Sequence, residues 1–359
     1  MIQKIHVDVL TPKQVLFFTP LLKKLTEHNI TTLLTTRKYR EVNQMMGLNK
    51  IHASVIGKHG KGDIAGKLEA SLKRTLKLSR FFKDTNPNLS LSFSSPEAAR
   101  VSYGLGIPHI TVNDSPHAEA VAKLTIPLSR KILTPAVIPI QAWKKHGATK
   151  KMVVKYNALD PFVWLKKFKP DKRSLKIFGL PTDEHLITVR PEESFASYLL
   201  NKTKGKTLII KIIEKLLTLK DVKIIVLPRY EEQIKILKNK FDKKIIIAEK
   251  AVDGASLLFF SSVFIGGGGT MTSESALIGV PTFSCYPEKS TFVEKYLIQK
   301  GLVTRINDPE LLTKSVTQTL KTLDETRQSQ IVRATKLISN MEDPTEVILK
   351  TILSFLNNR

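Results

Sequence analysis

The sequence contains a single cysteine, Cys285, which excludes an internal disulfide bond and fits a reducing compartment. Cys285 lies in an apolar, strand-like run, so we expect it in a hydrophobic core. The first residues include no hydrophobic run long enough to span a membrane, and they lack the pattern of a signal peptide. We therefore expect a soluble, cytoplasmic protein.

Several catalytic signatures are also absent. There is no Gly-x-Ser-x-Gly elbow, which leaves serine hydrolase chemistry unsupported. The eight histidines are scattered, and no His/Cys cluster has metal-ligand spacing, so we expect no metal site. The sequence has neither the Lys-Ser/Thr ending of a Walker loop nor the spacing of a GxGxxG motif.

Acidic residues are few: the chain has 32 acidic and 57 basic residues, which gives a net charge of +25. This excess favours anionic partners, such as nucleotide phosphates, lipid headgroups or nucleic acid, although a lysine-rich composition can also reflect codon bias. The basic, amphipathic segment 64–82 either rests on an anionic membrane or packs its apolar side on a sheet. With 359 residues, 42% of them hydrophobic, the chain can bury two cores.

Strand-like and helix-like segments alternate along the chain, which predicts parallel sheets covered by helices on both faces. A charged stretch with three prolines, 155–181, predicts the connection between two domains. We expect domains at 1–160 and 161–340, followed by an amphipathic helix within 341–359. The predicted strands are 5–10, 30–35, 50–55, 89–93, 107–112, 186–189, 222–227, 244–248, 262–265 and 282–284.

The most informative motif joins a predicted strand to a helix through four consecutive glycines. Glycine permits a tight turn and the close approach of a ligand, and the amides of the next helix carry the positive end of its dipole. This corner suits a phosphate or diphosphate, although many such corners are only tight turns. Glu274, about one helical turn further on, can accept hydrogen bonds from the hydroxyls of a ribose. The corner consists of Gly266, Gly267, Gly268, Gly269 and Thr270.

Ligands of open parallel sheets bind beyond the carboxyl ends of the strands, and four further positions meet this condition or come close to it. Asp8, in the first strand, is either a structural acceptor for loop amides or a functional carboxylate. Gln14 either contacts a ligand or acts as a cap partner at a helix start. Arg190 and Arg229 each follow a predicted strand, and they either hold phosphate or form surface ion pairs.

The segment after the predicted strand 107–112 brings Asp114, His117 and Glu119 together. Asp114 fits a helix N-cap as well as a catalytic carboxylate, with Pro116 in the first helical turn. Asp114 and His117 are three positions apart and can share one helix face, where either could move a proton.

Six blocks of the sequence carry a resemblance to a known family: 8–18, 103–108, 113–119, 156–165, 189–192 and 265–281. They resemble the family called domain of unknown function 354, which is related to GT-B glycosyltransferases and to UDP-N-acetylglucosamine 2-epimerases. The resemblance implies an α/β fold of two Rossmann-like domains with a cleft between them, and a C-terminal helix that crosses back to the N-terminal domain. Relatives tend to have a histidine where this chain has Gln14, so the duty of a general base would pass to Asp114 or His117.

The resemblance further implies a glycosyltransferase that uses a nucleoside-diphosphate sugar, expected to be UDP-linked, without a metal or cofactor. The C-terminal domain would bind this donor through the glycine corner, Glu274, Arg190 and Arg229. The N-terminal domain would hold the acceptor near Asp8 and Asp114, with Gln14 and Glu119 on the acceptor side.

Two alternative functions stay open from the sequence. A sugar-nucleotide 2-epimerase or hydrolase would use the same donor without an acceptor. A non-catalytic protein that binds polyanions would depend on the net charge alone. A basic surface also allows peripheral contact with the inner face of an anionic membrane, whereas nucleic acid is not an expected ligand.

Overall fold

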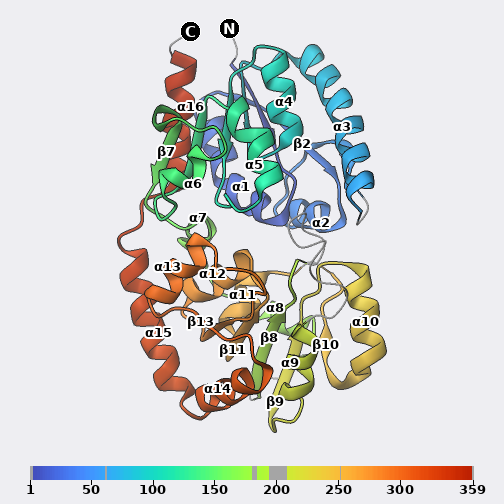
Figure 1. Ribbon diagram of the computed structural model, residues 1–359, viewed down its shortest axis with the longest axis vertical. Helices are drawn as coiled ribbons and strands as arrows, with labels where there is room; N and C mark the ends of the chain where they lie inside the picture. The colour runs from blue at the N-terminus through green and yellow to red at the C-terminus, as the bar shows by residue number, and fades with distance from the viewer. Residues whose placement is uncertain (1–2, 61–62, 180–183, 194–207, 251, 358–359) are drawn as a thin grey trace. The chain divides into compact units, whose positions relative to one another are not determined.

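The computed structural model describes residues 3–60, 63–179, 184–193, 208–250 and 252–357. The chain divides into two compact units (Figure 1). The first comprises Met1–Trp164 and Glu342–Arg359, and the second comprises Leu165–Met341. The first unit extends a few residues beyond the predicted boundary at 160. Asp160 accepts a hydrogen bond from Tyr156, and Val163 is buried. The last two residues of the predicted connection, 180 and 181, lie outside the described residues.

Within the described ranges, the first unit has a seven-stranded sheet in the order β3-β2-β1-β4-β5-β6-β7, and every neighbouring pair is parallel. Its register aligns Asp8 with Thr35 on one side and with Ser92 on the other. The strands are β1 (Lys4–Asp8), β2 (Thr31–Lys38), β3 (Ser54–Lys58), β4 (Leu89–Ser92), β5 (His109–Val112), β6 (Lys131–Pro135) and β7 (Val153–Tyr156).

Helices flank this sheet, and their ends follow local sequence signals. Helix α1 begins at Pro12 because Thr11 caps it by accepting from the Gln14 amide, and proline is tolerated in the first turn. The C-terminal helix, α16, packs against α1, where Lys24 pairs with Glu346 at 2.7 Å. The helices are α1 (Pro12–Glu27), α2 (Arg40–Leu48), α3 (Ile64–Thr85), α4 (Pro96–Gly104), α5 (Glu119–Thr125), α6 (Ile140–Lys144), α7 (Phe162–Leu165) and α16 (Pro344–Asn357), with 3-10 turns at Ile126–Leu128 and Lys150–Met152.

The second unit repeats this plan, with a six-stranded parallel sheet among its described residues in the order β10-β9-β8-β11-β12-β13. The strands are β8 (His185–Arg190), β9 (Val222–Val226), β10 (Ile246–Ile247), β11 (Val263–Gly266), β12 (Thr282–Ser284) and β13 (Thr304–Arg305). The helices are α8 (Arg173–Lys176), α9 (Leu208–Leu216), α10 (Glu231–Phe241), α11 (Gly254–Phe259), α12 (Thr270–Ile278), α13 (Phe292–Gln299), α14 (Pro309–Lys321) and α15 (Leu323–Ile338), with a 3-10 turn at Asp242–Lys244.

The core of the second unit explains why its strands are continuous apolar runs. Helices cover both faces of a parallel sheet, so its strands carry apolar side chains on both faces. On one face, side chains of β8, β9 and β11 pack against isoleucines of α9. Cys285 belongs to this core and is 2% exposed, which confirms the position expected from its apolar neighbours. Burial raises the pKa of its thiol well above the ordinary value, so the thiol is unreactive at neutral pH.

The prediction of two parallel sheets is confirmed, but three of the strands were not predicted from the sequence. Strand β7 overlaps the start of the charged stretch 155–181 that suggested a connection, β6 lies in a segment for which no strand was predicted, and β13 has only two residues. Strand β3 is Ser54–Lys58 rather than 50–55, because α2 and the turn that follows it extend into this range. No helix in the described ranges has the length and hydrophobicity needed to cross a bilayer.

The strand order reverses once in each sheet. The reversal lies between β1 and β4 in the first unit and between β8 and β11 in the second. Chain segments diverge to opposite sides at such a switch point, and ligands of open parallel sheets bind there, beyond the carboxyl ends of the strands. The segments leaving these four strands are therefore the primary candidates for function.

Candidate functional site

The glycine corner lies at the switch point of the second unit, between the ends of β8 and β11. Gly268 and Gly269 have φ angles of 96° and 97°, which side-chain-bearing residues rarely adopt. A Cβ atom on Gly267 would lie 2.5 Å from the amide nitrogen of Glu192, and one on Gly268 would lie 2.5 Å from the Tyr286 ring. Both conformation and close packing therefore require glycine here.

This corner leaves a row of backbone amides available. The Gly267 amide donates to the Arg190 carbonyl at 2.8 Å, and the Thr272 amide donates to the Gly269 carbonyl at 3.2 Å. Among the described residues, the intervening amides, from Gly268 to Met271, have no hydrogen-bond partner. Since these donors lie at the positive end of the α12 dipole, they form a site suited to an anion.

The two arginines expected at this rim brace the loops around it. Arg190 Nη1 donates to the carbonyls of Leu227 and Pro228 at 2.8 and 3.1 Å. Arg229 donates through Nε to the Pro191 carbonyl at 3.0 Å and through Nη2 to the Gly268 carbonyl at 3.2 Å. Their observed bonds therefore shape the corner, and the Arg229 contact satisfies the Gly268 carbonyl.

Arg229 also pairs with Glu193 at 3.2 Å, and its side chain is 16% exposed. Glu274, in the second turn of α12, is 5% exposed and takes part in an interaction within the chain. The expected contact with a ribose would therefore have to form at an almost buried carboxylate. Glu192, which the sequence analysis did not select, is also buried beside Gly267, and burial raises the pKa of its carboxyl.

In the first unit, the segments after β1, β5 and β7 bring a lysine between two aspartates. Lys13 Nζ lies 2.5 Å from Asp114 Oδ2 and 2.6 Å from Asp160 Oδ2. It also lies 4.3 Å from the centre of the Phe93 ring, which follows β4. Lys13, Asp114 and Asp160 are named here the lysine–aspartate cluster.

Their surroundings shift the pKa values of the two aspartates in opposite directions. Burial raises the pKa of Asp160, and the nearby Asp114 carboxylate adds to this effect against the attraction of Lys13. Burial acts on Asp114 in the same sense, but the Lys13 ammonium and a hydrogen bond from Ser115 hold its pKa below the ordinary value. The cluster thus combines a carboxyl that binds a proton readily with one that stays ionised.

Tyr156 and Ser115 complete the surroundings of the cluster. Tyr156 Oη donates to Asp160 Oδ1 at 2.6 Å, and this carboxyl is only 2% exposed, whereas that of Asp114 is 23% exposed.

Helix α5 begins at Glu119 with Ala118 as its N-cap, so Asp114 is not the helix cap that the sequence allowed. Its carboxylate instead faces Lys13.

The two other candidates of this segment differ from each other. His117 is exposed at the surface, yet partial desolvation lowers the pKa of its imidazole, against the effect of the Asp114 carboxylate. It is therefore mainly neutral at pH 7. Glu119 forms an exposed pair with Lys123 at 2.7 Å, which places it on the solvent side of α5.

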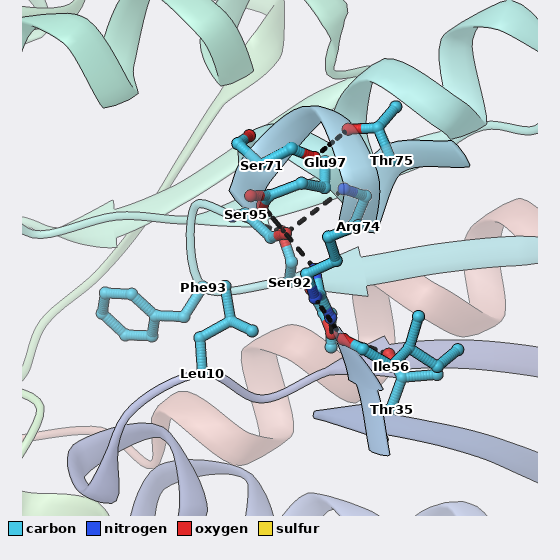
Figure 2. Close-up of polar contacts among 12 residues, drawn as sticks. Leu10, Thr35, Ile56, Ser71, Arg74, Thr75, Ser92, Phe93, Ser95 and Glu97 are labelled. Carbon is cyan, nitrogen blue, oxygen red and sulfur yellow. Dashed lines mark hydrogen bonds and ion pairs between the residues drawn. The ribbon is translucent and has the colours of Figure 1, made fainter. Parts of the chain in front are cut away.

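Asp8 belongs to a buried network instead of an exposed rim. Its carboxylate accepts from Arg74 Nη2 and from Thr35 Oγ1, both at 2.6 Å, and it is fully buried. Figure 2 shows Arg74 with Ser95 and Glu97 on one side and Thr35 and Ile56 on the other. Burial alone would raise the pKa of Asp8, but Arg74 holds it at about 2. This geometry supports a structural role, with the Arg74 guanidinium rather than loop amides as the main donor.

Gln14 is likewise engaged with the backbone. Its Oε1 accepts from the Leu10 amide at 2.7 Å, and its Nε2 donates to the Phe93 carbonyl at 3.1 Å. Gln14 therefore ties the loop after β1 to the loop after β4, in line with a cap partner at the helix start. The neighbouring residue, Lys13, carries the charge that the sequence analysis overlooked.

Comparison with known proteins agrees with this architecture. The chain is 31% identical over 360 residues to an uncharacterized protein of Methanocaldococcus jannaschii, and the match covers 98% of each chain. The UDP-GlcNAc 2-epimerase of Neisseria meningitidis bound to UDP-GlcNAc superposes with a TM-score of 0.76 at 15% identity, covering 98% of this chain and 100% of that one. The spinosyn rhamnosyltransferase SpnG, complexed with spinosyn aglycone, superposes with a TM-score of 0.63 at 14% identity, with the same coverage.

These structures are similar to the chain in fold, and they confirm the GT-B-like architecture of two Rossmann-like domains. A family model described as "Protein of unknown function (DUF354)" matches residues 3–357, which is almost the whole sequence. The chain therefore belongs to the DUF354 family.

Proposed function

We propose that this protein is a glycosyltransferase that takes its sugar from a nucleoside diphosphate, with UDP as the expected carrier. The observation that carries the proposal is the row of amides from Gly268 to Met271, which lack partners in the described chain at the switch point of the second sheet. Such amides bind a diphosphate in the ground state and stabilise the charge that develops as it leaves. They supply the positive potential that a metal would otherwise provide.

The other donor contacts follow from the same corner. Glu274, one turn into α12, is proposed to accept hydrogen bonds from the ribose. Arg229 is partly exposed and adds positive charge beside Gly269, at 3.0 Å from where a Cβ atom would lie. Arg190 is proposed to act mainly by holding the end of β9 in place, since its observed bonds go to backbone carbonyls.

In the first unit we assign the acceptor chemistry to His117 and Asp114. A neutral imidazole can take the proton of an acceptor hydroxyl, whose oxygen then bonds to the anomeric carbon of the sugar. The bond from this carbon to the diphosphate oxygen breaks, and the nucleoside diphosphate departs with the electron pair. Asp114 stays ionised and stabilises the imidazolium that forms, while Lys13 fixes the orientation of its carboxylate.

A second candidate is a sugar-nucleotide 2-epimerase or hydrolase, and the lysine–aspartate cluster favours it. Asp160 binds a proton readily and Asp114 does not, so the cluster offers an acid and a base side by side without a second substrate. A known UDP-GlcNAc 2-epimerase also shares the fold. The exposed position of His117 favours the transferase, because a separate acceptor can reach it from solvent.

Product analysis separates the candidates. The protein would be incubated with UDP-GlcNAc alone and, separately, with a panel of hydroxyl-bearing acceptors. A transferase releases UDP substantially only with an acceptor, whereas an epimerase or hydrolase alters the sugar nucleotide without one. A polyanion binder would do neither, and its affinity for UDP would fall steeply with salt and would not depend on Gly268.

A further inference from the structure

His146 is a buried histidine whose ring contacts the segment that carries His117. It lies in the turn after α6 and is 4% exposed. Its Nε2 lies 2.9 Å from the carbonyl oxygen of Pro116, which is 30 positions away in the sequence. Because a carbonyl oxygen only accepts hydrogen bonds, Nε2 carries the hydrogen and donates it. One hydrogen bond therefore joins the turn after α6 to the loop after β5.

The turn that carries His146 is anchored in a hydrophobic core. Trp143, three positions earlier, is fully buried, and its carbonyl accepts from the His146 amide at 2.9 Å. The same core includes Ala122 of α5 and Ile132 of β6. His146 thus extends from a well-packed part of the unit, and its hydrogen bond can hold a loop in place.

The position of this hydrogen bond matters for His117. The carbonyl of Pro116 and the amide of His117 belong to one planar peptide group, so a bond to the carbonyl fixes the plane from which the His117 backbone continues. At the other end of the segment, Lys13 holds Asp114 at 2.5 Å. The two contacts fix the two residues to which we assign the proton transfer.

The second ring nitrogen of His146 gives no additional hydrogen bond. Among the described residues, Nδ1 is buried and has no partner. Burial of a polar atom without a partner is unfavourable, and an apolar side chain would avoid it. An apolar side chain could not donate to Pro116, however, so the bond from Nε2 is the feature that requires a donor at this position.

We propose that His146 is a positioning residue, which holds the peptide before His117 so that the His117 imidazole stays beside the Asp114 carboxylate. This inference rests on the proposed function, in which His117 takes the proton of the acceptor and Asp114 stabilises the imidazolium. Since His146 is buried, it acts through His117 and not on the substrate. Without its hydrogen bond, the His117 ring would spend less time in the orientation that suits proton transfer.

Two substitutions separate the hydrogen bond from the volume of the ring. His146→Gln retains an N–H donor near the position of Nε2, whereas His146→Met fills a similar volume without a donor. His185→Met is the matched control, because a ring nitrogen of His185 also contacts a single hydroxyl, that of Ser262 at 3.3 Å, at the start of β8 in the second unit. Urea unfolding checks that each variant is folded.

NMR titration of the His117 imidazole tests the positioning without any substrate, and His117→Gln identifies the signal. In the wild type, desolvation lowers the pKa of His117; the Asp114 carboxylate opposes this effect and the Lys145 ammonium adds to it. In His146→Met we expect the pKa to rise toward the ordinary value, because the loop loses its fixed position. It should stay unchanged in His146→Gln and His185→Met. An unchanged pKa in His146→Met would overturn the proposal.

Turnover provides a second readout. His146→Met should lower kcat by roughly 10- to 100-fold and leave KM for the UDP-sugar within about twofold, because a small displacement of a catalytic group is costly and this substrate is assigned to the second unit. His146→Gln should retain most of the activity. An equal loss in both variants, or no loss in His146→Met, would contradict the proposal. If no sugar nucleotide is turned over, the proposed function fails, and the NMR titration alone decides whether His146 positions His117.

Discussion

Lys13 and Asp114 are 101 positions apart in the sequence, yet the Lys13 ammonium lies 2.5 Å from the Asp114 carboxylate. The contact exists because β1 and β5 lie in one parallel sheet, and the segments leaving them meet at its carboxyl edge. Asp160 reaches the same ammonium from the end of β7. One cation thus fixes two carboxylates whose proton affinities differ.

The first prediction concerns removal of this cation. Lys13→Met leaves two carboxylates close together without a counter-charge, and breaking a buried pair costs about 3–5 kcal/mol. We expect the free energy of unfolding in urea at pH 7 to fall by this amount. Lys123→Met is the control, because its pair with Glu119 is exposed to solvent and contributes little to stability. Equal stability of the two variants would contradict a structural role for Lys13.

The second prediction separates Asp114 from Glu119, which lie in the same segment. Asp114→Asn removes the charge that stabilises His117 as it takes up a proton, so we expect kcat to fall by roughly 100-fold or more. The Kd for the nucleoside diphosphate, measured by calorimetry, should stay within about twofold, since this ligand is assigned to the other unit. Glu119→Gln should leave kcat unchanged, and a large loss in that variant would move the chemistry to the exposed face of α5.

The third prediction tests whether Asp8 is structural. Arg74→Met leaves the Asp8 carboxylate buried without its counter-charge, and we expect about 3–5 kcal/mol of destabilisation. The double variant Arg74→Met with Asp8→Asn should recover part of this loss, because the unpaired charge is gone. If Asp8→Asn alone abolished turnover without any change in stability, Asp8 would be catalytic.

The sequence was sufficient to place some of these groups and not others. The strand-to-helix corner after β11 was predictable, because four glycines after an apolar run leave few alternatives, and the parallel sheets followed from alternation. Asp160 was missed because its strand, β7, has only four residues in a lysine-rich stretch. The partner of Asp8 was missed because Arg74 lies on a helix far along the chain, in a segment whose basic residues otherwise face solvent.

The role of the arginines could not be predicted from the sequence for a related reason. A strand-end position shows that Arg190 and Arg229 lie near the rim. It does not show how many of their N–H groups donate hydrogen bonds to backbone carbonyls. That number depends on where the loops after β8, β9 and β11 bring their carbonyls. Only tertiary structure fixes this geometry.

The fourth prediction concerns acid stability and two buried histidines. Burial lowers the pKa of His6 to about 4 and that of His109 to about 3. The unfolded chain therefore binds more protons than the folded chain between those values and about 6.5, so stability falls as the pH is lowered through this window. We expect a loss on the order of 2–3 kcal/mol for each histidine between pH 6.5 and 4. Urea unfolding as a function of pH measures it, and His109→Gln should have a shallower slope than the wild type.

Asp160 acts in the opposite direction within this window. Its pKa is raised in the folded state, so the folded chain binds this proton more tightly and gains stability as the pH falls toward the ordinary value of the carboxyl. Asp160→Asn removes this gain, and the variant should lose stability on acidification more steeply than the wild type. An unchanged slope would show that Asp160 titrates as an ordinary carboxyl.

The central claim is that the amides from Gly268 to Met271 hold the diphosphate of a nucleotide, and calorimetric titration with UDP tests it most directly. A Cβ atom on Gly268 would lie 2.5 Å from the Tyr286 ring, whereas Gly106, also at positive φ, has no neighbour within 4 Å of such an atom. We predict that UDP binds the wild type and Gly106→Ala equally and binds folded Gly268→Ala at least tenfold more weakly. Wild-type affinity in Gly268→Ala, or no binding of any nucleoside diphosphate to the wild type, would contradict the account.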